Sequence, residues 1–263
     1  MTRTLPHRFA ARFLPKGWPD LLRQLLLFCG AYWLYRFVRG FTDGRVAQAF
    51  ENARDLIRIE QALGLFVEPA VHAWARGTSW IIDGASWMYV NSHFTITTLT
   101  LAFIYLRRNP SFYFIRNMFM VAMGIALVLY AAYPTAPPRF MPEYGFSDSV
   151  ADFTGITAEG SSADALYNPF AAVPSMHVAF ALMLGISMAS MARHAWAKAL
   201  WLCYPAMVSF VVVATANHWW FDAFTGALTA GVAALAAMLF ARARPAAWAW
   251  MPGTPAPTAQ QAV

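Results

Sequence analysis

Six long apolar stretches alternate with polar and basic segments along the chain. A helix needs about 20 mainly apolar residues to cross a hydrocarbon core of about 30 Å. The stretches of about this length lie at residues 21–40, 81–106, 112–133, 176–192, 198–216 and 220–241. The pattern predicts six membrane-spanning helices. The first contains three arginines and follows a basic segment without a cleavage site, which is typical of an uncleaved anchor.

Basic residues gather at alternate ends of these stretches. They precede the first, separate the second from the third and the fourth from the fifth, and follow the sixth. They are Arg3, Arg8, Arg12, Lys16, Arg107, Arg108, Arg116, Arg193, Lys198, Arg242 and Arg244. If the helices alternate, all lie on one side, and the positive-inside rule makes that side cytoplasmic. Both termini are then cytoplasmic, and the connections near residues 41–80, 134–175 and 217–219 face outward.

The two long outward connections differ in kind. Residues 46–63 carry apolar side chains close to helical spacing, which predicts an amphipathic helix in the membrane interface. The apolar positions are Val46, Phe50, Ala53, Ile57 and Leu63. This helix is either a structural brace or a device that admits a lipid. Residues 134–174 are rich in Pro, Gly, Ser and Asp and predict an irregular loop.

Composition supports the membrane class. The chain is 59% hydrophobic and 12% charged, with a mean hydropathy of +0.44, whereas soluble domains carry about 25% charged residues. The net charge of +6 lies in short clusters beside apolar stretches rather than along one surface, which argues against nucleic-acid binding. Cys29 and Cys203 lie inside apolar stretches and form neither a disulfide framework nor a set of metal ligands.

The expected architecture is an all-α polytopic membrane protein, a bundle of six transmembrane helices with an outer interfacial amphipathic helix. We expect a cytoplasmic basic N-terminus at 1–20, one membrane domain at 21–244 and a disordered Pro/Ala-rich tail at 245–263. A bacterial inner membrane is the simplest location, with the site facing the periplasm or exterior. A eukaryotic secretory membrane with a luminal site is the alternative.

Three motifs bring polar residues to the predicted outer face: YPTAPPRF at 133–140, NPFAAVPSMHVAF at 168–180 and NHWWFD at 217–222. In the third motif His218 and Asp222 are one helical turn apart. A carboxylate in this position can hold one imidazole N–H and leave the other nitrogen free to attack phosphorus. The alternative is a structural His–Asp pair at the interface.

The other two motifs offer an acid and a cation. His177 follows a Pro-Ser pair at the start of the predicted fourth helix, where backbone N–H groups bind phosphate well and an imidazole can protonate a leaving alkoxide. Arg139 can clamp the negative charge of a phosphoryl group. The structural alternatives are a capped helix with an interfacial histidine, and an arginine that contacts a lipid head group.

PSMH followed by HxxxD resembles the type 2 phosphatidic acid phosphatase superfamily. The two longer words resemble its inositol phosphorylceramide synthase-like branch, and the likeness runs from about residue 46 to 241. The resemblance implies that His218 is a nucleophile that forms a phosphohistidine, oriented by Asp222. It implies that His177 is the acid for the leaving group and that Ser175 helps to bind phosphate. It also implies a reaction without a metal ion or other cofactor.

The chain departs from the superfamily pattern at positions that normally carry cations. If Arg139 is the arginine of the superfamily's KxxxxxxRP motif, Ala132 takes the place of the lysine and Phe140 that of the proline. Val212 takes the place of the arginine that precedes the catalytic histidine. The loss of two phosphate-binding cations argues against plain phosphatase behaviour and favours the synthase-like branch.

Four more polar residues are candidates for substrate binding. Asn91 and His93 lie about 14 to 16 residues before Arg107, which places them roughly 21–24 Å above it in the outer part of the bilayer. Polar residues inside a span are usually functional or pair within the bundle. Tyr133 and Asn168 flank the first two motifs and are weaker candidates.

The sequence therefore predicts a metal-independent phosphotransferase acting on membrane lipids, with a phospholipid donor and a lipid hydroxyl as acceptor. A lipid phosphate phosphatase with water as acceptor is one alternative. The others are a non-catalytic lipid-binding or transport protein and a metal-dependent membrane hydrolase. The motifs specify neither the lipids nor the oligomeric state.

Overall fold

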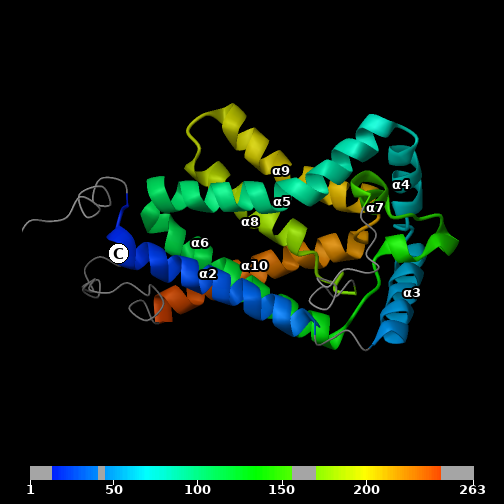
Figure 1. The fold of residues 1–263 in the computed structure, drawn as a ribbon, viewed down its shortest axis with the longest axis horizontal. Helices are drawn as coiled ribbons and strands as arrows, with labels where there is room; N and C mark the ends of the chain where they lie inside the picture. Colours follow the sequence, from blue (N-terminus) through cyan, green and yellow to red (C-terminus); the bar gives the residue numbers. More distant parts are fainter. Residues whose placement is uncertain (1–13, 41–44, 156–169, 244–263) are drawn as a thin grey trace, which may run out of the picture.

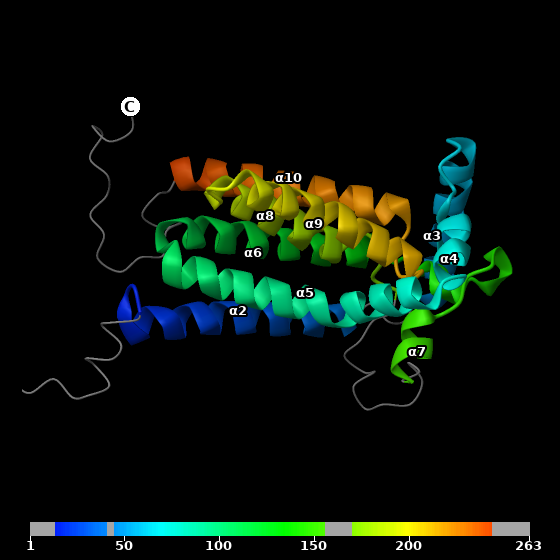
Figure 2. The ribbon, with the colours of Figure 1, turned by 90° about the horizontal axis from the view of Figure 1, so that it is seen from above.

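Six long helices form the body of the protein. The computed structural model describes residues 14–40, 45–155 and 170–243, and every regular element in these ranges is a helix. The long helices run side by side along the long axis (Figure 1, Figure 2). They are α2 (Gly17–Gly40), α5 (Ser79–Arg107), α6 (Asn109–Ala132), α8 (Met176–Met191), α9 (Ala195–Ala214) and α10 (Trp220–Ala243). Each of the six apolar stretches is thus helical. The expected tail at 245–263 and most of the basic N-terminus lie outside the described residues.

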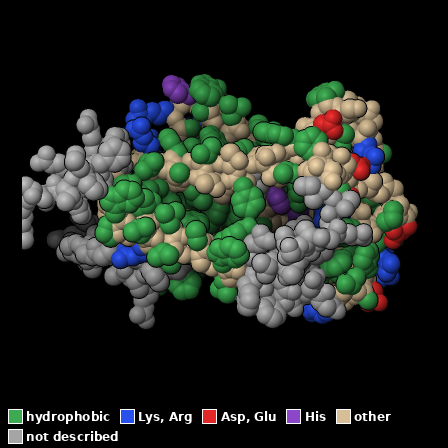
Figure 3. Space-filling model, viewed as in Figure 1, with side chains coloured by type: hydrophobic (Ala, Val, Ile, Leu, Met, Phe, Trp, Pro, Cys, Tyr) green, Lys and Arg blue, Asp and Glu red, His purple; other side chains and the backbone are tan. Residues whose placement is uncertain are grey.

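Length and composition identify a membrane protein. The helices α6, α9 and α10 are each long and apolar enough to cross a membrane. α8 and the Phe94–Arg107 part of α5 are apolar but shorter. On the face seen in Figure 3, hydrophobic side chains cover the flank of the bundle, and charged side chains lie towards its two ends. Hydropathy predicted six membrane crossings. Among the described residues, three helices meet both the length and the composition criterion for a crossing.

Small residues let the helices of the bundle approach closely. α8 packs against α6, α9 and α10. At its contact with α9, a Cβ on Gly185 would lie 2.6 Å from the carbonyl oxygen of Trp201. At its contact with α6, the rings of Phe119 and Phe180 stack with centroids 4.5 Å apart. α8 is therefore the central helix of the bundle.

A buried polar network joins α2 to the bundle at the end that carries Arg107. Asp20 of α2 accepts hydrogen bonds from the hydroxyls of Tyr105 at 2.9 Å and Tyr113 at 2.8 Å. Arg116 of α6 donates to Gln24 of α2 at 2.6 Å. Arg116 is 1% exposed. Its expected place among the surface cations that set topology is therefore wrong, because its charge is used inside the bundle.

A layer of helices and turns lies across the opposite end (Figure 1, Figure 2). It contains α3 (Val46–Ala62), α4 (Glu68–Arg76), the 3-10 turns η1 (Pro138–Phe140) and η2 (Pro142–Tyr144), and α7 (Ser149–Thr154). The loop expected at 134–174 is thus partly helical. The expected amphipathic helix is present as α3, but its buried face is rotated: Val46 and Leu63 are exposed. The buried residues are Ala49, Asn52, Ala53, Leu56, Ile57 and Glu60.

His72 of α4 ties this layer to the bundle. The side chain is 1% exposed. Its Nδ1 lies 2.7 Å from the carbonyl oxygen of Ala214, and the backbone N–H of Ser147 donates to its Nε2 at 3.3 Å. Nδ1 must carry the proton and Nε2 must be bare, so the ring is neutral. Burial lowers the pKa of His72 below its ordinary value of 6.5.

We expect acid to weaken this attachment. Because the folded protein binds a proton at His72 less readily than the unfolded chain does, the stability contributed by the neutral ring is complete above pH 6.5 and is lost as the pH falls below it. Thermal unfolding in detergent between about pH 7 and about pH 5 should show this loss. His72→Gln should flatten the dependence, and His194→Gln, at an exposed histidine, should not. Equal pH dependence in all three proteins would contradict this role of His72.

Candidate active site

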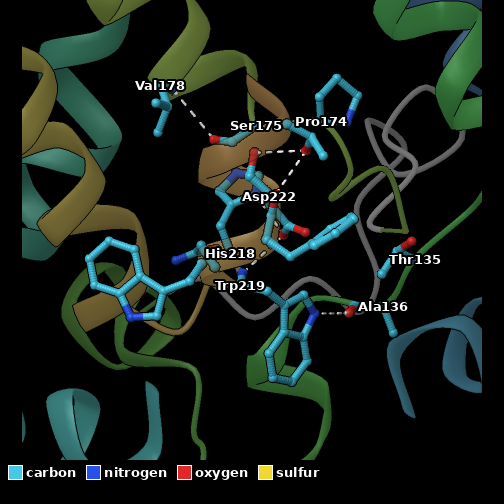
Figure 4. Close-up of polar contacts among 12 residues, drawn as sticks. Thr135, Ala136, Pro174, Ser175, Val178, His218, Trp219 and Asp222 are labelled. Carbon is cyan, nitrogen blue, oxygen red and sulfur yellow. Dashed lines mark hydrogen bonds and ion pairs between the residues drawn. The ribbon is translucent and has the colours of Figure 1, made fainter. Parts of the chain in front are cut away.

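The three motifs meet at the end of the bundle covered by α3 and α4. The backbone N–H of Thr135 donates to the carbonyl of Phe170 at 2.7 Å, which joins the first motif to the second. The indole N–H of Trp219 donates to the carbonyl of Ala136 at 3.0 Å, which joins the third motif to the first (Figure 4). The N–H of Ser175 donates to the backbone carbonyl of Asp222 at 2.9 Å, which joins the second to the third. Backbone contacts thus hold all three motifs in one constellation.

His218 and Asp222 form the pair expected from their spacing. Nδ1 of His218 lies 3.2 Å from Oδ2 of Asp222 (Figure 4). The same oxygen accepts the N–H of Trp219 at 2.9 Å. Asp222 has no exposed surface, and His218 is 6% exposed. Because Nδ1 donates to the carboxylate, the lone pair of the neutral imidazole lies on Nε2, the nitrogen that a nucleophile would use.

A tight turn between α9 and α10 places His218 directly before α10. Ala216 has a φ of 55°, a left-handed conformation that is uncommon for a residue with a Cβ. The N–H groups of Asn217 and His218 both donate to the carbonyl of Val212, at 3.0 and 3.1 Å. This closes the end of α9 and lets α10 begin at once, so Asp222 falls in the first turn of α10.

His177 faces His218 from the start of α8. The two imidazole centroids are 5.5 Å apart, and the ring planes are inclined at 63°. Tyr89 of α5 stacks on the other side of His177, with centroids 4.7 Å apart. A second imidazole thus lies near the first with its plane held by an aromatic ring, as a proton donor to a leaving group requires.

Arg139 lies in the wall beside the two histidines, held by polar partners. Its Nη1 donates to the side-chain oxygen of Asn217, and its Nε lies 3.3 Å from Oδ2 of Asp148. Its backbone N–H donates to Ala216 at 2.8 Å. The side chain is 6% exposed, so its position is fixed. Asp148 offsets part of the charge of the guanidinium, which is nevertheless oriented before any anion arrives.

Ser175 occupies a structural position. Its hydroxyl is fully buried and accepts the N–H of Val178 at 3.5 Å as the N-cap of α8 (Figure 4). It is not among the residues that line the cavity beside the histidines. The structure therefore places Ser175 at the start of α8, two residues before His177.

Two of the further candidates for substrate binding, Asn91 and Tyr133, are not among the residues that line the cavity. Asn91 is exposed, and its amide donates to the carbonyl of Trp87 at 2.9 Å on the same helix. The hydroxyl of Tyr133 donates to the carbonyl of Asn52 at 3.2 Å, away from the cavity. The side chain of His93 and residue Asn168 lie outside what the structure describes. The aromatic residue of α5 that reaches the site is Tyr89, which the sequence analysis missed.

An apolar cavity extends from the two histidines into the bundle. It has a volume of about 950 Å³, and His177, His218 and Arg139 line one end of it. Along α5 its lining runs from Tyr89 to Leu106, which is about 25 Å at 1.5 Å per residue. Apolar side chains of α2, α5 and α6 form most of the wall.

Comparison with known families agrees with this geometry. The sequence model described as the PAP2 superfamily matches residues 54–236, which is more than half of the chain. The chain belongs to the PAP2 superfamily. In this PAP2 chain the match begins in α3, ends in α10 and includes all three motifs. No curated protein and no solved structure matches. Membership indicates a phosphatase-type enzyme acting on lipid phosphates, and the match does not identify a branch within the superfamily.

Gly226 permits the close approach of α10 to the segment that begins α8. A Cβ at this position would overlap the carbonyl oxygen of Ser175 and lie 3.2 Å from its carbonyl carbon. Gly231 lies on the same helix and has open space around it.

We expect Gly226→Ala to push α10 away from the start of α8 and to separate His218 from His177. Overpacking of this kind costs about 1–3 kcal/mol, and a displacement of about 1 Å can lower the rate by about 100-fold. Gly231→Ala should leave activity unchanged. Thermal unfolding and initial rates of both variants test this, and equal behaviour of the two would contradict it.

Proposed function

We propose that this protein is a lipid head-group phosphotransferase that works through a phosphohistidine at His218. The observation that carries the proposal is the His218–Asp222 pair, 3.2 Å apart, with the ring of His177 5.5 Å away at the mouth of an apolar cavity. A phosphoester at this mouth would have a nucleophile and an acid beside it, and its hydrocarbon part would lie inside the bundle.

The first half-reaction moves the phosphoryl group or phospho-head-group onto the enzyme. Nε2 of His218 attacks phosphorus, and the bond from phosphorus to the leaving oxygen breaks. Protonated His177 gives its proton to that oxygen, so the donor lipid departs as an alcohol. The carboxylate of Asp222 stabilises the positive charge that develops on the imidazole of His218.

The second half-reaction reverses these roles. The acceptor hydroxyl gives its proton to the now neutral His177, and its oxygen attacks phosphorus. The N–P bond breaks and returns the free imidazole of His218. Arg139 is positioned to bind the phosphoryl oxygens in both steps, because its guanidinium is fixed by Asn217 and Asp148 before the substrate arrives.

Two features favour a lipid hydroxyl over water as the acceptor. Val212 takes the place of a superfamily arginine and is 1% exposed within an apolar cluster. The cavity next to the histidines is mainly apolar and is the size of a ligand site. Both features, together with the resemblance to the inositol phosphorylceramide synthase-like branch, support transfer between lipids. Hydrolysis is the second candidate, because membership of the PAP2 superfamily favours a phosphatase.

The proposed topology follows from the charge pattern. We infer six spans, cytoplasmic termini and a site at the outer face of a bacterial inner membrane. The layer of α3 and α4 that covers the site would then lie in the outer interface. The arginines at the other end of α5 would lie in the cytoplasm, as the positive-inside rule requires.

A lipid-product assay with and without acceptor separates the candidate functions. Purified protein in detergent with EDTA would receive phosphatidylinositol, phosphatidic acid or a polyprenyl phosphate, with or without diacylglycerol or ceramide. We expect a new phospholipid that forms only with acceptor. His218→Ala should lower the rate by about 1,000-fold or more, and His194→Ala should have no effect.

Each alternative has its own outcome in the same assay. Free phosphate regardless of acceptor would establish the phosphatase. Loss of activity with EDTA would indicate a metal-dependent hydrolase. Equal turnover in wild type and His218→Ala would overturn the proposed nucleophile.

We expect a bulky side chain inside the cavity to obstruct the hydrocarbon chain of the substrate. Thr97 of α5 lines the cavity, whereas Leu99 is 64% exposed on another side of the helix. Thr97→Trp should raise KM for a long-chain donor by about tenfold or more, because uniform binding energy is lost. It should spare a short-chain soluble donor, and Leu99→Trp should change neither. Equal effects on long-chain and short-chain donors would contradict a hydrocarbon site in this cavity.

A further inference from the structure

Two buried glutamates of the outer layer contact the first turn of the catalytic helix. Glu60 of α3 is 3% exposed and Glu68 of α4 has no exposed surface. Oε1 of Glu60 accepts the backbone N–H of Phe221 at 3.0 Å. Oε1 of Glu68 accepts the backbone N–H of Trp220 at 3.0 Å. Both N–H groups lie in the segment that connects His218 to Asp222.

These contacts complete a set of three carboxylates at the start of α10. The first N–H groups of a helix have no partner within the helix and lie at the positive end of its dipole. Here Asp222 accepts the N–H of Trp219, Glu68 that of Trp220 and Glu60 that of Phe221. Asp222 lies in the same turn, whereas the two glutamates come from more than 150 positions earlier in the chain.

The surroundings of Glu60 favour the protonated form of its carboxyl group. Burial, together with the hydrogen bond and the charge of Glu68, raises the pKa of Glu60 to about 9. The charge of Asp222 acts in the same direction, and the N–H of Phe221 acts against it. The charged groups that act on Glu60 are thus Glu68 from α4 and Asp222 from α10. In the described part of the chain, the second oxygen of each glutamate, Oε2, is also buried and accepts no hydrogen bond from an N–H or O–H group.

We propose that Glu60 and Glu68 are positioning residues, a hydrogen-bonded carboxyl–carboxylate unit that fixes the first turn of α10 and so orients His218 and Asp222. The inference rests on the proposed role of His218 as nucleophile. It also explains why α3 and α4 lie across this end of the bundle, since they anchor the catalytic helix from the outer side. Neither glutamate contacts the substrate.

The nature of the unit predicts different outcomes for different substitutions. A glutamine at position 60 keeps an oxygen for the N–H of Phe221 and an N–H for Glu68, so it reproduces the protonated state. An alanine removes both contacts. Loss of the proton of Glu60 at high pH places two negative charges side by side in a buried site, which should loosen the first turn of α10. Glu60→Gln cannot undergo this loss of a proton, because its amide does not ionise.

The experiment is a pH profile of kcat and KM from about pH 6 to about pH 10. It would compare wild type, Glu60→Ala, Glu60→Gln and Glu51→Gln, which changes an exposed glutamate of α3. We expect Glu60→Ala to lower kcat at neutral pH by about 10- to 100-fold with KM nearly unchanged. Glu60→Gln should recover that loss and abolish the fall of kcat near pH 9. Glu51→Gln should keep the wild-type profile.

Thermal unfolding gives a readout that does not need turnover. Because the folded protein binds the proton of Glu60 more tightly than the unfolded chain does, the corresponding stability falls as the pH rises from 4.5 to about 9. Glu60→Gln should flatten this dependence, and Glu51→Gln should not.

The outcomes separate this inference from the proposed function. If His218→Ala is inactive but Glu60→Ala keeps wild-type kcat, the positioning role is overturned and the proposed nucleophile stands. If Glu60→Ala does not fold, the profile of Glu60→Gln decides: a retained fall of kcat near pH 9 overturns the role of the Glu60 proton. Equal turnover in wild type and His218→Ala overturns both proposals.

Discussion

The buried carboxylate of Asp222 is the interaction on which the rest of the site depends. An ionised carboxylate without exposed surface is costly in an apolar bundle unless donors surround it. Here Oδ2 receives the imidazole N–H of His218 and the backbone N–H of Trp219, whereas Oδ1 is buried and has no hydrogen-bond partner among the described residues. The backbone carbonyl of the same residue receives the N–H of Ser175. One residue therefore contacts His218, the first turn of α10 and the segment that leads into α8. Gly226, one turn later, permits this close approach because it has no side chain.

The distribution of polar groups along the bundle gives the molecule its direction. Polar side chains gather at both ends, the catalytic pair at one and the network of Asp20 and Arg116 at the other. Between them lies an apolar cavity lined mainly by α2, α5 and α6. An amphiphile fits such a site in one orientation, with its charged group at the histidines and its hydrocarbon part along α5. The polar network also explains why α2 packs against α6 although it carries charged residues.

The sequence predicted the parts of the structure that depend on local patterns. Hydropathy located the six long helices because each is a continuous apolar stretch, and spacing predicted the His218–Asp222 pair because residues four apart share a helix face. The convergence of the three motifs also followed, from alternation of the helices. The helix α3 was predicted, but the face of this helix that is buried is rotated relative to the predicted apolar face. Glu60 continues the buried face three residues after Ile57, so a glutamate at a buried helical position was a signal in the sequence.

Contacts between distant segments could not be predicted. Nothing in the sequence near Tyr89 indicates that it stacks on His177, and nothing near Glu68 indicates that it accepts the N–H of Trp220. The resemblance implies that Ser175 binds phosphate, and the structure adds that its buried hydroxyl caps α8. The left-handed Ala216, which turns the chain from α9 into α10, has no glycine or asparagine to mark it.

The two helices that meet at the site differ in the charge at their starts, and this difference agrees with the proposed roles. The first N–H groups of α10 donate to three acidic side chains, and the negative charge of Asp222 in the first turn compensates the positive end of its dipole. α8 begins with a neutral serine cap and has no acidic residue in its first turn. Its positive end therefore remains on the side of His177 and Arg139, where a phosphate would be attracted. The carboxylates at α10 would instead repel a phosphate and stabilise positive charge on His218. This difference in charge is what the proposed phosphohistidine mechanism needs, with an anion near α8 and a developing positive charge near α10.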